Sequence, residues 1–523
     1  MLNSIFIKTF IARLLSFVVS VFLLAFPVCA QSYGDPVDEL LFSSEDPAED
    51  ADADKTGSAK EEIPAKFEKA NLDMHVVYGQ YNNMLSVINL SQERRGFAYI
   101  LNSNYKRSND YGYKDTVYNN SSFFENSLEF SGNLSFDDSF SSTLTVGVEN
   151  DSRGMFDKID YSREEKDKFT IYSKNIRKFS QNYEAYIVFD AAFYKHRLER
   201  RDEEAESIRN YLTRYAGEVG GEYIWSSSNR ISYMVQGSQY NYSETGIGDD
   251  RFIHGQIVDD FKITGLFGAN VGLNTAWSKD SGLFAWDAQG IPLPLMPMAG
   301  ITFFGNDYYT VYSNYKYTLE SFRPEEYYFS LNYISPTYNL PPAKVHYADL
   351  QLDLMMPGAF SVKSVLSYEK SNNFYNYLPS EVSENLLTAH AVPASKWSFT
   401  TDLDMNLIGK KVRFLGSYHL KYFQAEENIT YQPEVTYIMG LRYDGSLLNV
   451  DWTNHFLGEV YVNPETGKKL DNATVGYLDI QFKATESFYA YLRLENLYNE
   501  MYYIRDGYPE SGLTILFGLR VIL

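Results

Sequence analysis

The 523-residue sequence contains a single cysteine, Cys29, so no disulfide can form within the chain. Its seven histidines are scattered, and none stands at metal-ligand spacing from another. There is no glycine-rich phosphate loop and no grouping of serine, histidine and acid. These absences argue against catalysis, so we expect a protein that is not an enzyme and that needs no cofactor.

Positive charge is also scarce. The chain has 46 Lys and Arg against 68 Asp and Glu, a net charge of −22, which argues against a nucleic-acid partner. The acidic excess fits either solvated loops or a pore that favours cations. After Ala30 no apolar run is long enough for a membrane-spanning helix, and the mean hydropathy is −0.34.

The N-terminus has the anatomy of a secretory signal peptide. Lys8 and Arg13 precede an apolar stretch at residues 14–28, and small residues then offer a cleavage site. We predict that residues 1–30 are removed between Ala30 and Gln31. The alternative is a lipoprotein with its lipid on Cys29.

Residues 31–70 form a second compositional block. They are rich in Asp, Glu, Ala, Pro and Ser and carry a net charge of −8. A segment with so little apolar surface cannot form a core, so we expect it to be disordered and periplasmic.

The abundant residues are aromatic, with 45 Tyr and 35 Phe. The C-terminal residues show strict alternation: Leu513, Ile515 and Phe517 share one face of an extended chain, and Thr514 and Gly518 lie on the other. Period-two segments about ten residues long with one apolar face are typical of transmembrane β-strands. A soluble sandwich or propeller is the alternative, but no repeat of fixed period supports a propeller.

Connections of two kinds alternate along residues 71–523. The short ones are Ser91–Arg94, Asp137–Phe140, Ser180–Asn182, Ser226–Ser228, Lys262–Thr264, Gly305–Asp307, Met356–Ala359, Gly409–Lys410, Asp444–Ser446 and Ala484–Ser487. The long ones include Arg107–Ser122, Asp151–Asp167, His196–Arg214, Lys279–Pro294, Ser321–Lys344, Ser371–Ser395, Phe423–Gln432, Gly458–Asn472 and Leu497–Ser511. Outer-membrane barrels have short periplasmic turns and long outer loops, so the pattern predicts an all-β, 22-stranded antiparallel transmembrane barrel.

The last strand is expected to pair with the first, because an open strand edge cannot be satisfied in lipid. Gly518, Val521 and Leu523 fit a relaxed signal for the barrel-assembly machinery. Outer-membrane lipid is the expected surrounding, in the bacterial outer membrane.

Three segments resemble the barrel of TonB-dependent outer-membrane receptors. They are Glu495-Asn-Leu-Tyr-Asn-Glu-Met-Tyr502 followed by Gly507-Tyr-Pro509, the stretch from Pro297 to Phe322-Arg323-Pro324, and Val77-Tyr-Gly-Gln-Tyr-Asn82. The resemblance departs at Leu513, where the family has an arginine, and at Leu523, where an aromatic residue is usual. It covers residues 71–523 only.

The resemblance implies a receptor-like transport protein for a small solute. The family's plug domain should lie before the barrel, and residues 31–70 are too few and too acidic to form one. We therefore expect either a separate plug protein or inward-folded loops, together with a possible periplasmic energy-coupling partner. The alternatives are a structural or surface-interaction protein with a loop-blocked lumen, and a passive porin.

Two groups of loop residues are candidate contact residues. Phe322, Arg323 and Pro324 belong to the mid-barrel resemblance. Arg197, Arg200 and Arg201 stand in a run dense in both charge signs, where a solvated loop and a lipopolysaccharide contact are both open. The sequence does not identify the solute.

Overall fold

The structure is a computed structural model that describes residues 70–94, 96–113, 116–117, 121–137, 139–155, 161–202, 207–243, 250–278, 295–306, 308–320, 340, 342–379, 387–505 and 508–523. Among these residues, no helix is long and apolar enough to cross a bilayer. The signal peptide, its cleavage site at Ala30 and Gln31, and the acidic segment before residue 70 lie outside the described residues.

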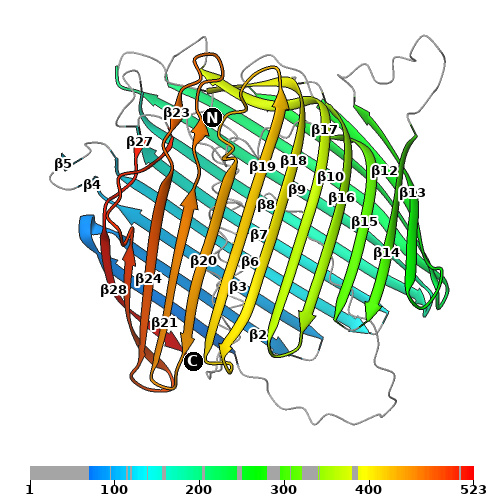
Figure 1. The fold of residues 1–523 in the computed structure, drawn as a ribbon, viewed down its shortest axis with the longest axis horizontal. Helices are drawn as coiled ribbons and strands as arrows, with labels where there is room; N and C mark the ends of the chain where they lie inside the picture. The colour runs from blue at the N-terminus through cyan, green and yellow to red at the C-terminus, as the bar shows by residue number, and fades with distance from the viewer. Residues whose placement is uncertain are drawn as a thin grey trace.

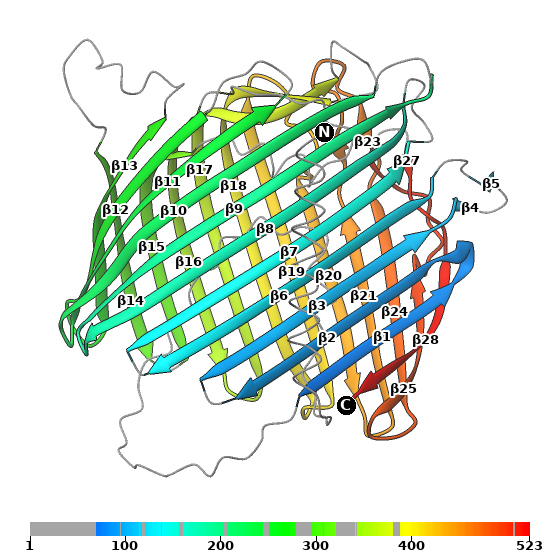
Figure 2. The ribbon, with the colours of Figure 1, turned by 180° about the vertical axis from the view of Figure 1, so that it is seen from behind.

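Twenty-two strands form one antiparallel sheet that closes on itself (Figures 1 and 2). They are β1 (Asn71–Gly79), β2 (Met84–Arg94), β3 (Phe97–Ser108), β6 (Phe123–Asp137), β7 (Phe140–Gly154), β8 (Tyr161–Ser180), β9 (Tyr183–Arg200), β10 (Ile208–Ser226), β11 (Asn229–Ser243), β12 (Asp250–Lys262), β13 (Phe267–Ser278), β14 (Met296–Asn306), β15 (Tyr309–Glu320), β16 (Ala343–Met356), β17 (Phe360–Pro379), β18 (Leu387–Ile408), β19 (Val412–Ala425), β20 (Val435–Asp444), β21 (Leu448–Leu457), β24 (Ala473–Lys483), β25 (Phe488–Glu495) and β28 (Thr514–Ile522).

The outer connections contain one short 3-10 helix and three two-stranded ribbons among the described residues. They are η1 (Gln80–Asn82) and the two-stranded ribbons formed by β4 (Gly112–Tyr113) with β5 (Thr116–Val117), β22 (Val460–Tyr461) with β23 (Lys469–Leu470), and β26 (Tyr503–Arg505) with β27 (Tyr508–Pro509). The predicted fold class and strand count are therefore confirmed.

Each strand separates an apolar outer face from a polar inner one. On β10, Val219 and Tyr223 point outward and are 52% and 43% exposed. Glu218, one position away, points inward, and Arg214 on the same inner face pairs with Asp190 of β9 at 2.5 Å. An apolar band on the outside of a closed barrel is the surface that meets lipid. The fold thus places the chain in the bacterial outer membrane.

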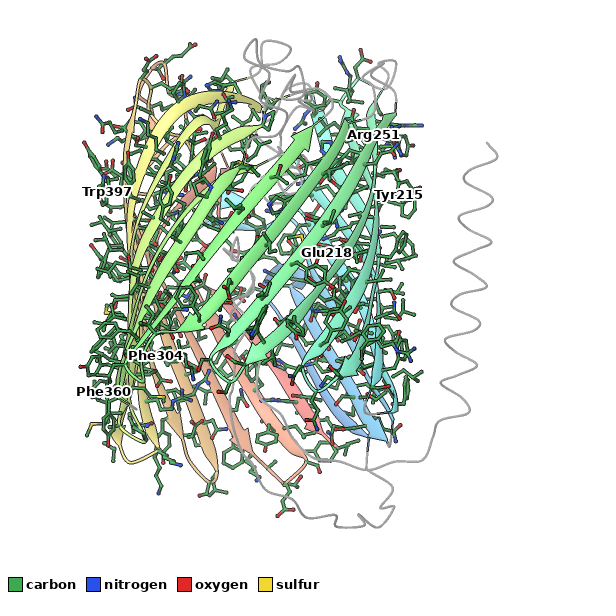
Figure 3. The ribbon with its side chains drawn as sticks, turned by 90° about the vertical axis from the view of Figure 1, so that its right-hand side faces the viewer. Tyr215, Glu218, Arg251, Phe304, Phe360 and Trp397 are labelled. Carbon is green, nitrogen blue, oxygen red and sulfur yellow. The ribbon has the colours of Figure 1, made fainter. Side chains whose placement is uncertain are left out.

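Aromatic side chains mark the upper edge of this band. Figure 3 shows Tyr215 and Trp397 on the outline of the barrel at similar heights, with Phe360 much lower on the same side as Trp397. Tyr215 packs edge-on against Phe193 at 6.0 Å, and Trp397 packs against Tyr368 at 4.7 Å. Aromatic girdles of this kind lie at the membrane interface.

Nine of the ten predicted turns fall between neighbouring strands at the periplasmic end, and several strands are longer than expected. The exception is Ser91–Arg94, which belongs to β2. Much of the predicted loops His196–Arg214 and Ser371–Ser395 is strand, in β9, β10, β17 and β18. Here both faces carry a mixture of polar and apolar residues, because the hairpins extend beyond the bilayer, and the alternation that reveals a membrane strand is lost.

The seam between β1 and β28 closes the barrel. Val77 lies opposite Gly518, Met74 lies opposite Val521, and Leu72 and Leu523 exchange backbone hydrogen bonds of 3.0 and 2.8 Å. The guanidinium of Arg520 donates to both carboxylate oxygens of Asp73, at 3.0 and 2.7 Å. The expected pairing of the last strand with the first is confirmed.

Closure requires close approach of the two backbones at Gly518. A Cβ atom there would collide with the carbonyl oxygen of Val76 and with the side chain of Val77. We predict that Gly518→Ala strongly reduces the amount of folded barrel, because a backbone oxygen cannot move aside without opening the seam. Heat-modifiable mobility in gel electrophoresis of the membrane fraction measures this amount.

The control is Gly237→Ala. Gly237 lies within β11, and a Cβ atom there would meet nothing within 4 Å. Its folded yield should match that of the wild type. Equal yields for Gly518→Ala and Gly237→Ala would contradict the account of the seam.

Candidate functional site

Three outer connections, those from β17 to β18, from β19 to β20 and from β21 to β24, are held together by hydrogen bonds around one asparagine. The side chain of Asn376 on β17 is fully buried. Its amide nitrogen donates to Glu427 Oε1 at 2.7 Å and to the carbonyl of Asn428 at 3.0 Å. Its amide oxygen accepts from the backbone nitrogen and the hydroxyl of Thr430, both at 2.8 Å. The connection from β19 to β20 is thereby attached to the β17–β18 hairpin.

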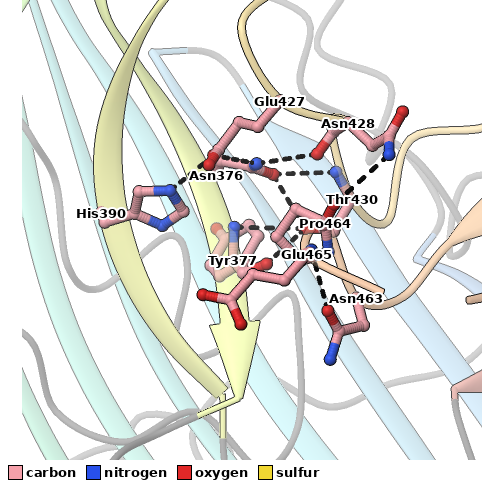
Figure 4. Close-up of polar contacts among 9 residues, drawn as sticks. All are labelled: Asn376, Tyr377, His390, Glu427, Asn428, Thr430, Asn463, Pro464 and Glu465. Atoms are coloured by element: carbon pink, nitrogen blue, oxygen red, sulfur yellow. Dashed lines mark hydrogen bonds and ion pairs between the residues drawn. The ribbon is translucent and has the colours of Figure 1, made fainter. Parts of the chain in front are cut away.

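A histidine completes this attachment. His390 Nε2 on β18 lies 2.6 Å from the same Glu427 oxygen (Figure 4). The Thr430 hydroxyl also lies 2.8 Å from the carbonyl oxygen of Tyr377, so its single proton is shared between this oxygen and that of Asn376, and the hydroxyl accepts from the Tyr377 nitrogen at 3.1 Å. The backbone nitrogen and the hydroxyl of Thr430 are thus both hydrogen-bonded, which suits a residue that is 1% exposed.

The connection from β21 to β24 joins the same assembly. Thr430 bridges to Tyr461 of β22, and the Tyr431 nitrogen donates to the Tyr461 carbonyl at 2.9 Å. Asn428 reaches the carbonyl of Pro464 at 3.3 Å. We call residues 374–379, 387–392, 426–434 and 458–472 the outer platform. In Figure 1 the upper ends of β17 and β18 bend over the opening of the barrel.

The platform lines a cavity of about 460 Å³ that is open to solvent on one side. Its lining residues are Phe423, Ala425, Glu426, Glu427, Asn428, Ile429, Gln432, Glu434, Tyr461, Pro464 and Glu465. Four of them are glutamates and none is basic. Lys469, in the same connection, is engaged by Glu459 at 2.9 Å, and this hydrogen bond raises the pKa of Lys469. The cavity therefore offers carboxylates and aromatic faces, a combination that suits cations.

Below the platform, the inner wall carries paired charges. Arg442 of β20 donates to Asp451 of β21 at 2.8 and 2.6 Å, and Arg413 of β19 pairs with Asp404 of β18. Arg493 of β25 contacts Glu495 at 3.0 Å. Each cation lies beside a carboxylate, so the wall is polar without a large field of one sign.

The opposite side of the mouth is covered by an apolar cluster. Tyr111, Met155, Tyr161 and Leu198 are buried together at the outer ends of β7, β8 and β9 and in the connection after β3. Glu164, Lys166 and His196 are buried among these outer strand ends, and Glu164 lies 2.8 Å from His196. Ordered chain thus covers parts of both sides of the opening.

The candidate arginines have different surroundings. Arg197 on β9 contacts Glu165 at 3.4 Å and Glu199 at 3.1 Å. The guanidinium of Arg200 lies over the ring of Tyr161, and Arg201 donates to the carbonyls of Tyr161 and Met155. The three do not converge on one site. Phe322, Arg323 and Pro324 lie outside the described residues, and Gly518, Val521 and Leu523 are at the seam.

No local sequence pattern predicts the platform residues. Asn376 and Thr430 are separated by more than fifty positions, and the sequence predicts a loop at residues 371–395. The adjacent pair Glu426-Glu427 was the one visible signal. Among the described residues, no three histidines or acids are placed to hold a metal ion.

The C-terminal motif that begins at Glu495 has a structural role, which centres on Asn496. Asn496 adopts a left-handed conformation, with φ of 51°. Its side chain donates to the carbonyls of Glu500 and Ser511 at 2.8 and 2.9 Å and accepts from the Glu500 nitrogen at 3.0 Å. Asparagine tolerates this conformation better than most residues, so the motif shapes the loop between β25 and β28.

No family model and no curated protein matches the sequence, but solved structures match the fold. The siderophore receptor PirA from Acinetobacter baumannii aligns with a TM-score of 0.66 at 10% identity, over 88% of this chain and 81% of that one. The FrpB iron transporter from Neisseria meningitidis gives 0.68 at 10%, over 87% and 81%. The copper transporter OprC gives 0.63 at 12%, over 88% and 82%.

The fold is that of a TonB-dependent receptor barrel. The predicted resemblance is thus confirmed at the level of architecture. The similar proteins include a siderophore receptor, an iron transporter and a copper transporter, so the fold itself does not select a ligand.

We predict that Asn376→Ala releases residues 426–434 from the barrel while the strands stay folded. The substitution leaves the Thr430 nitrogen without its buried acceptor and removes one of the two partners of Glu427, of which His390 remains, and each lost partner costs about 1–3 kcal/mol. Hydrogen exchange of 426–434 should accelerate, and heat-modifiable mobility should stay unchanged. Asn472→Ala, at an exposed asparagine of the platform, is the control. Equal exchange in both variants would refute the role of Asn376.

Proposed function

We propose that this chain is an outer-membrane receptor for uptake of a small cationic solute, which binds first in the acidic cavity of the outer platform. The single observation that carries the proposal is that cavity of about 460 Å³, held by three fastened connections at the mouth of a receptor-type barrel. The proteins with this fold include a siderophore receptor and iron and copper transporters. A receptor role therefore suits the architecture.

The chemistry of the cavity supports the choice of a cation. Glu426, Glu434 and Glu465 can accept charge-assisted hydrogen bonds, and Phe423 supplies an aromatic face. An anionic solute would meet repulsion from the same carboxylates. The platform is ordered by Asn376 before any solute arrives, so little conformational entropy is lost on binding.

We further propose that the lumen is filled by inward loops or by a separate plug protein. Residues 31–70 are too few for a plug domain, and a barrel of this width without one would leak solutes. A periplasmic energy-coupling partner would then act through that plug. The barrel-assembly machinery and lipopolysaccharide remain expected partners.

Binding to the purified full-length protein tests the receptor proposal. Spermidine, a flexible trication, serves as the probe and citrate as its anionic counterpart, with isothermal calorimetry at low salt. Glu426→Gln, Glu434→Gln and Glu465→Gln combined should weaken spermidine binding at least about tenfold, since a charge-assisted contact contributes about 1.5 kcal/mol or more. Glu427 is left intact because it fastens the platform.

The matched control is Glu486→Gln, at an exposed glutamate of a periplasmic turn. It should bind spermidine like the wild type. Tighter binding of citrate than of spermidine, or an unchanged affinity in the triple variant, would rule out a cation site in this cavity.

A surface-interaction protein with a blocked lumen is the second candidate. It is favoured by the hairpin of β17 and β18 bending over the opening and by the apolar cluster on the other side. In that case the platform would bind a partner on the cell surface, and no solute would pass.

Planar-bilayer conductance separates a covered mouth, which both of these functions share, from a passive porin. For a covered mouth we predict little conductance from the intact protein and a large rise when residues 374–392 are replaced by a short turn, because this removes the outer ends of β17 and β18 that bend over the opening. A wide-pore conductance in the intact protein that the replacement leaves unchanged would instead identify a passive porin.

A further inference from the structure

The outward face of β15 to β18 is unusual just beyond its aromatic girdle. Tyr315, Tyr317, Tyr368 and Trp397 share this face, and Tyr368 lies directly opposite Trp397. Trp397 stands on the outline of the barrel in Figure 3. Since the girdle marks the membrane interface, residues one step closer to the outer rim lie at the level of the lipid headgroups.

Three basic side chains occupy that step. His346 of β16 lies directly opposite Lys370 of β17, and Lys344 precedes His346 by two positions, so all three share the outward face. Opposite side chains in such a pair have Cβ atoms about 5 Å apart. We call Lys344, His346 and Lys370 the basic triangle.

The girdle holds the histidine in place. The His346 ring stacks on Tyr317 at 4.3 Å with an interplanar angle of 8°. Its Nδ1 lies 3.0 Å from the hydroxyl of Tyr315. His346 is therefore held by two tyrosines of the neighbouring strand β15.

The two lysines of the triangle have no ionic partner among the residues that the structure describes. Leu319 lies opposite Lys344, whose backbone nitrogen donates to the Asn372 side chain, and Ser395 lies opposite Lys370. The nearest charges along the chain, Glu369 and Lys396, pair with each other at 2.5 Å on the inner face. Both Lys344 and Lys370 are exposed.

The wall of β8 and β9 shows the contrasting case. There Lys195 contacts Asp167 at 2.7 Å, and Arg197 is shared between two glutamates. Both of these cations are therefore paired with carboxylates of the protein. Lys344 and Lys370 lie at the level of the headgroups and form no ion pair with a described carboxylate, so an anionic lipid headgroup would be a favourable partner for them.

We propose that the basic triangle binds a phosphate of the outer-leaflet glycolipid, a molecule of the lipopolysaccharide type. The triangle lies on the outer half of the barrel, so its neighbours are lipids of the outer leaflet. A phosphate bound between Lys344 and Lys370 would leave the acyl chains beside Tyr368 and Trp397. The site is distinct from Arg197, Arg200 and Arg201, and it does not depend on the solute-binding cavity.

The experiment uses the full-length protein in detergent micelles with bisphosphorylated lipid A as the probe, and native mass spectrometry counts bound lipid. The combined variant Lys344→Gln and Lys370→Gln should bind lipid A at least about tenfold more weakly, equivalent to about 1.4 kcal/mol. The single variant Lys370→Gln should show an intermediate loss. Heat-modifiable mobility verifies that each variant is folded.

The matched control is Lys195→Gln, which removes a compensated lysine from the other wall and should leave binding unchanged. Wild-type affinity in the combined variant, or an equal loss in Lys195→Gln, would overturn the site. Equally tight binding of phosphatidylglycerol, with the same dependence on the two lysines, would overturn its assignment to a glycolipid. Spermidine binding should be unaffected in every variant.

Discussion

The rest of the structure depends on the pairing of β1 with β28. In a bilayer no water can satisfy an exposed backbone group, so a sheet that spans it must close. Closure here joins residues separated by almost the whole chain, through the ladder from Asp73 to Ile522 and the ion pair of Asp73 with Arg520. Once the sheet is closed, each strand has a fixed inner and outer face. The platform and the basic triangle are both consequences of that division.

Much of the fold could be predicted because the membrane imposes a simple rule on each strand. Alternation located the spanning strands, and turn residues located the periplasmic connections, as at Ser180–Asn182 and Ser226–Ser228. The rule ends where the bilayer ends. Beyond it, β17 and β18 continue with polar and apolar residues mixed on both faces, and the sequence there resembles a loop. The contacts of Asn376 with Glu427 and Thr430 join three separate connections, and no local pattern predicts such contacts.

The strongly acidic composition is distributed unevenly over the molecule. Several carboxylates of the inner wall pair with arginines, as in the pair of Arg442 with Asp451. Among the described residues, Glu426, Glu434 and Glu465 of the platform cavity form no ion pair, and neither do Lys344 and Lys370 on the outward face of β16 and β17. A single barrel can display both signs because its wall separates two environments. The cavity meets the aqueous exterior, whereas the triangle meets the membrane.

The two ends of the sheet are neighbours, since Leu72 and Leu523 bond to each other at the periplasmic rim. A short linker between them would turn the barrel into a ring of strands without a structurally privileged first member. The gene could then be cut at another periplasmic turn, such as that between Asp444 and Leu448, and the same barrel would be encoded in a new order. The closed sheet therefore does not require any particular strand to come first in the chain. What the architecture does preserve under every such rearrangement is the order of neighbours around the ring.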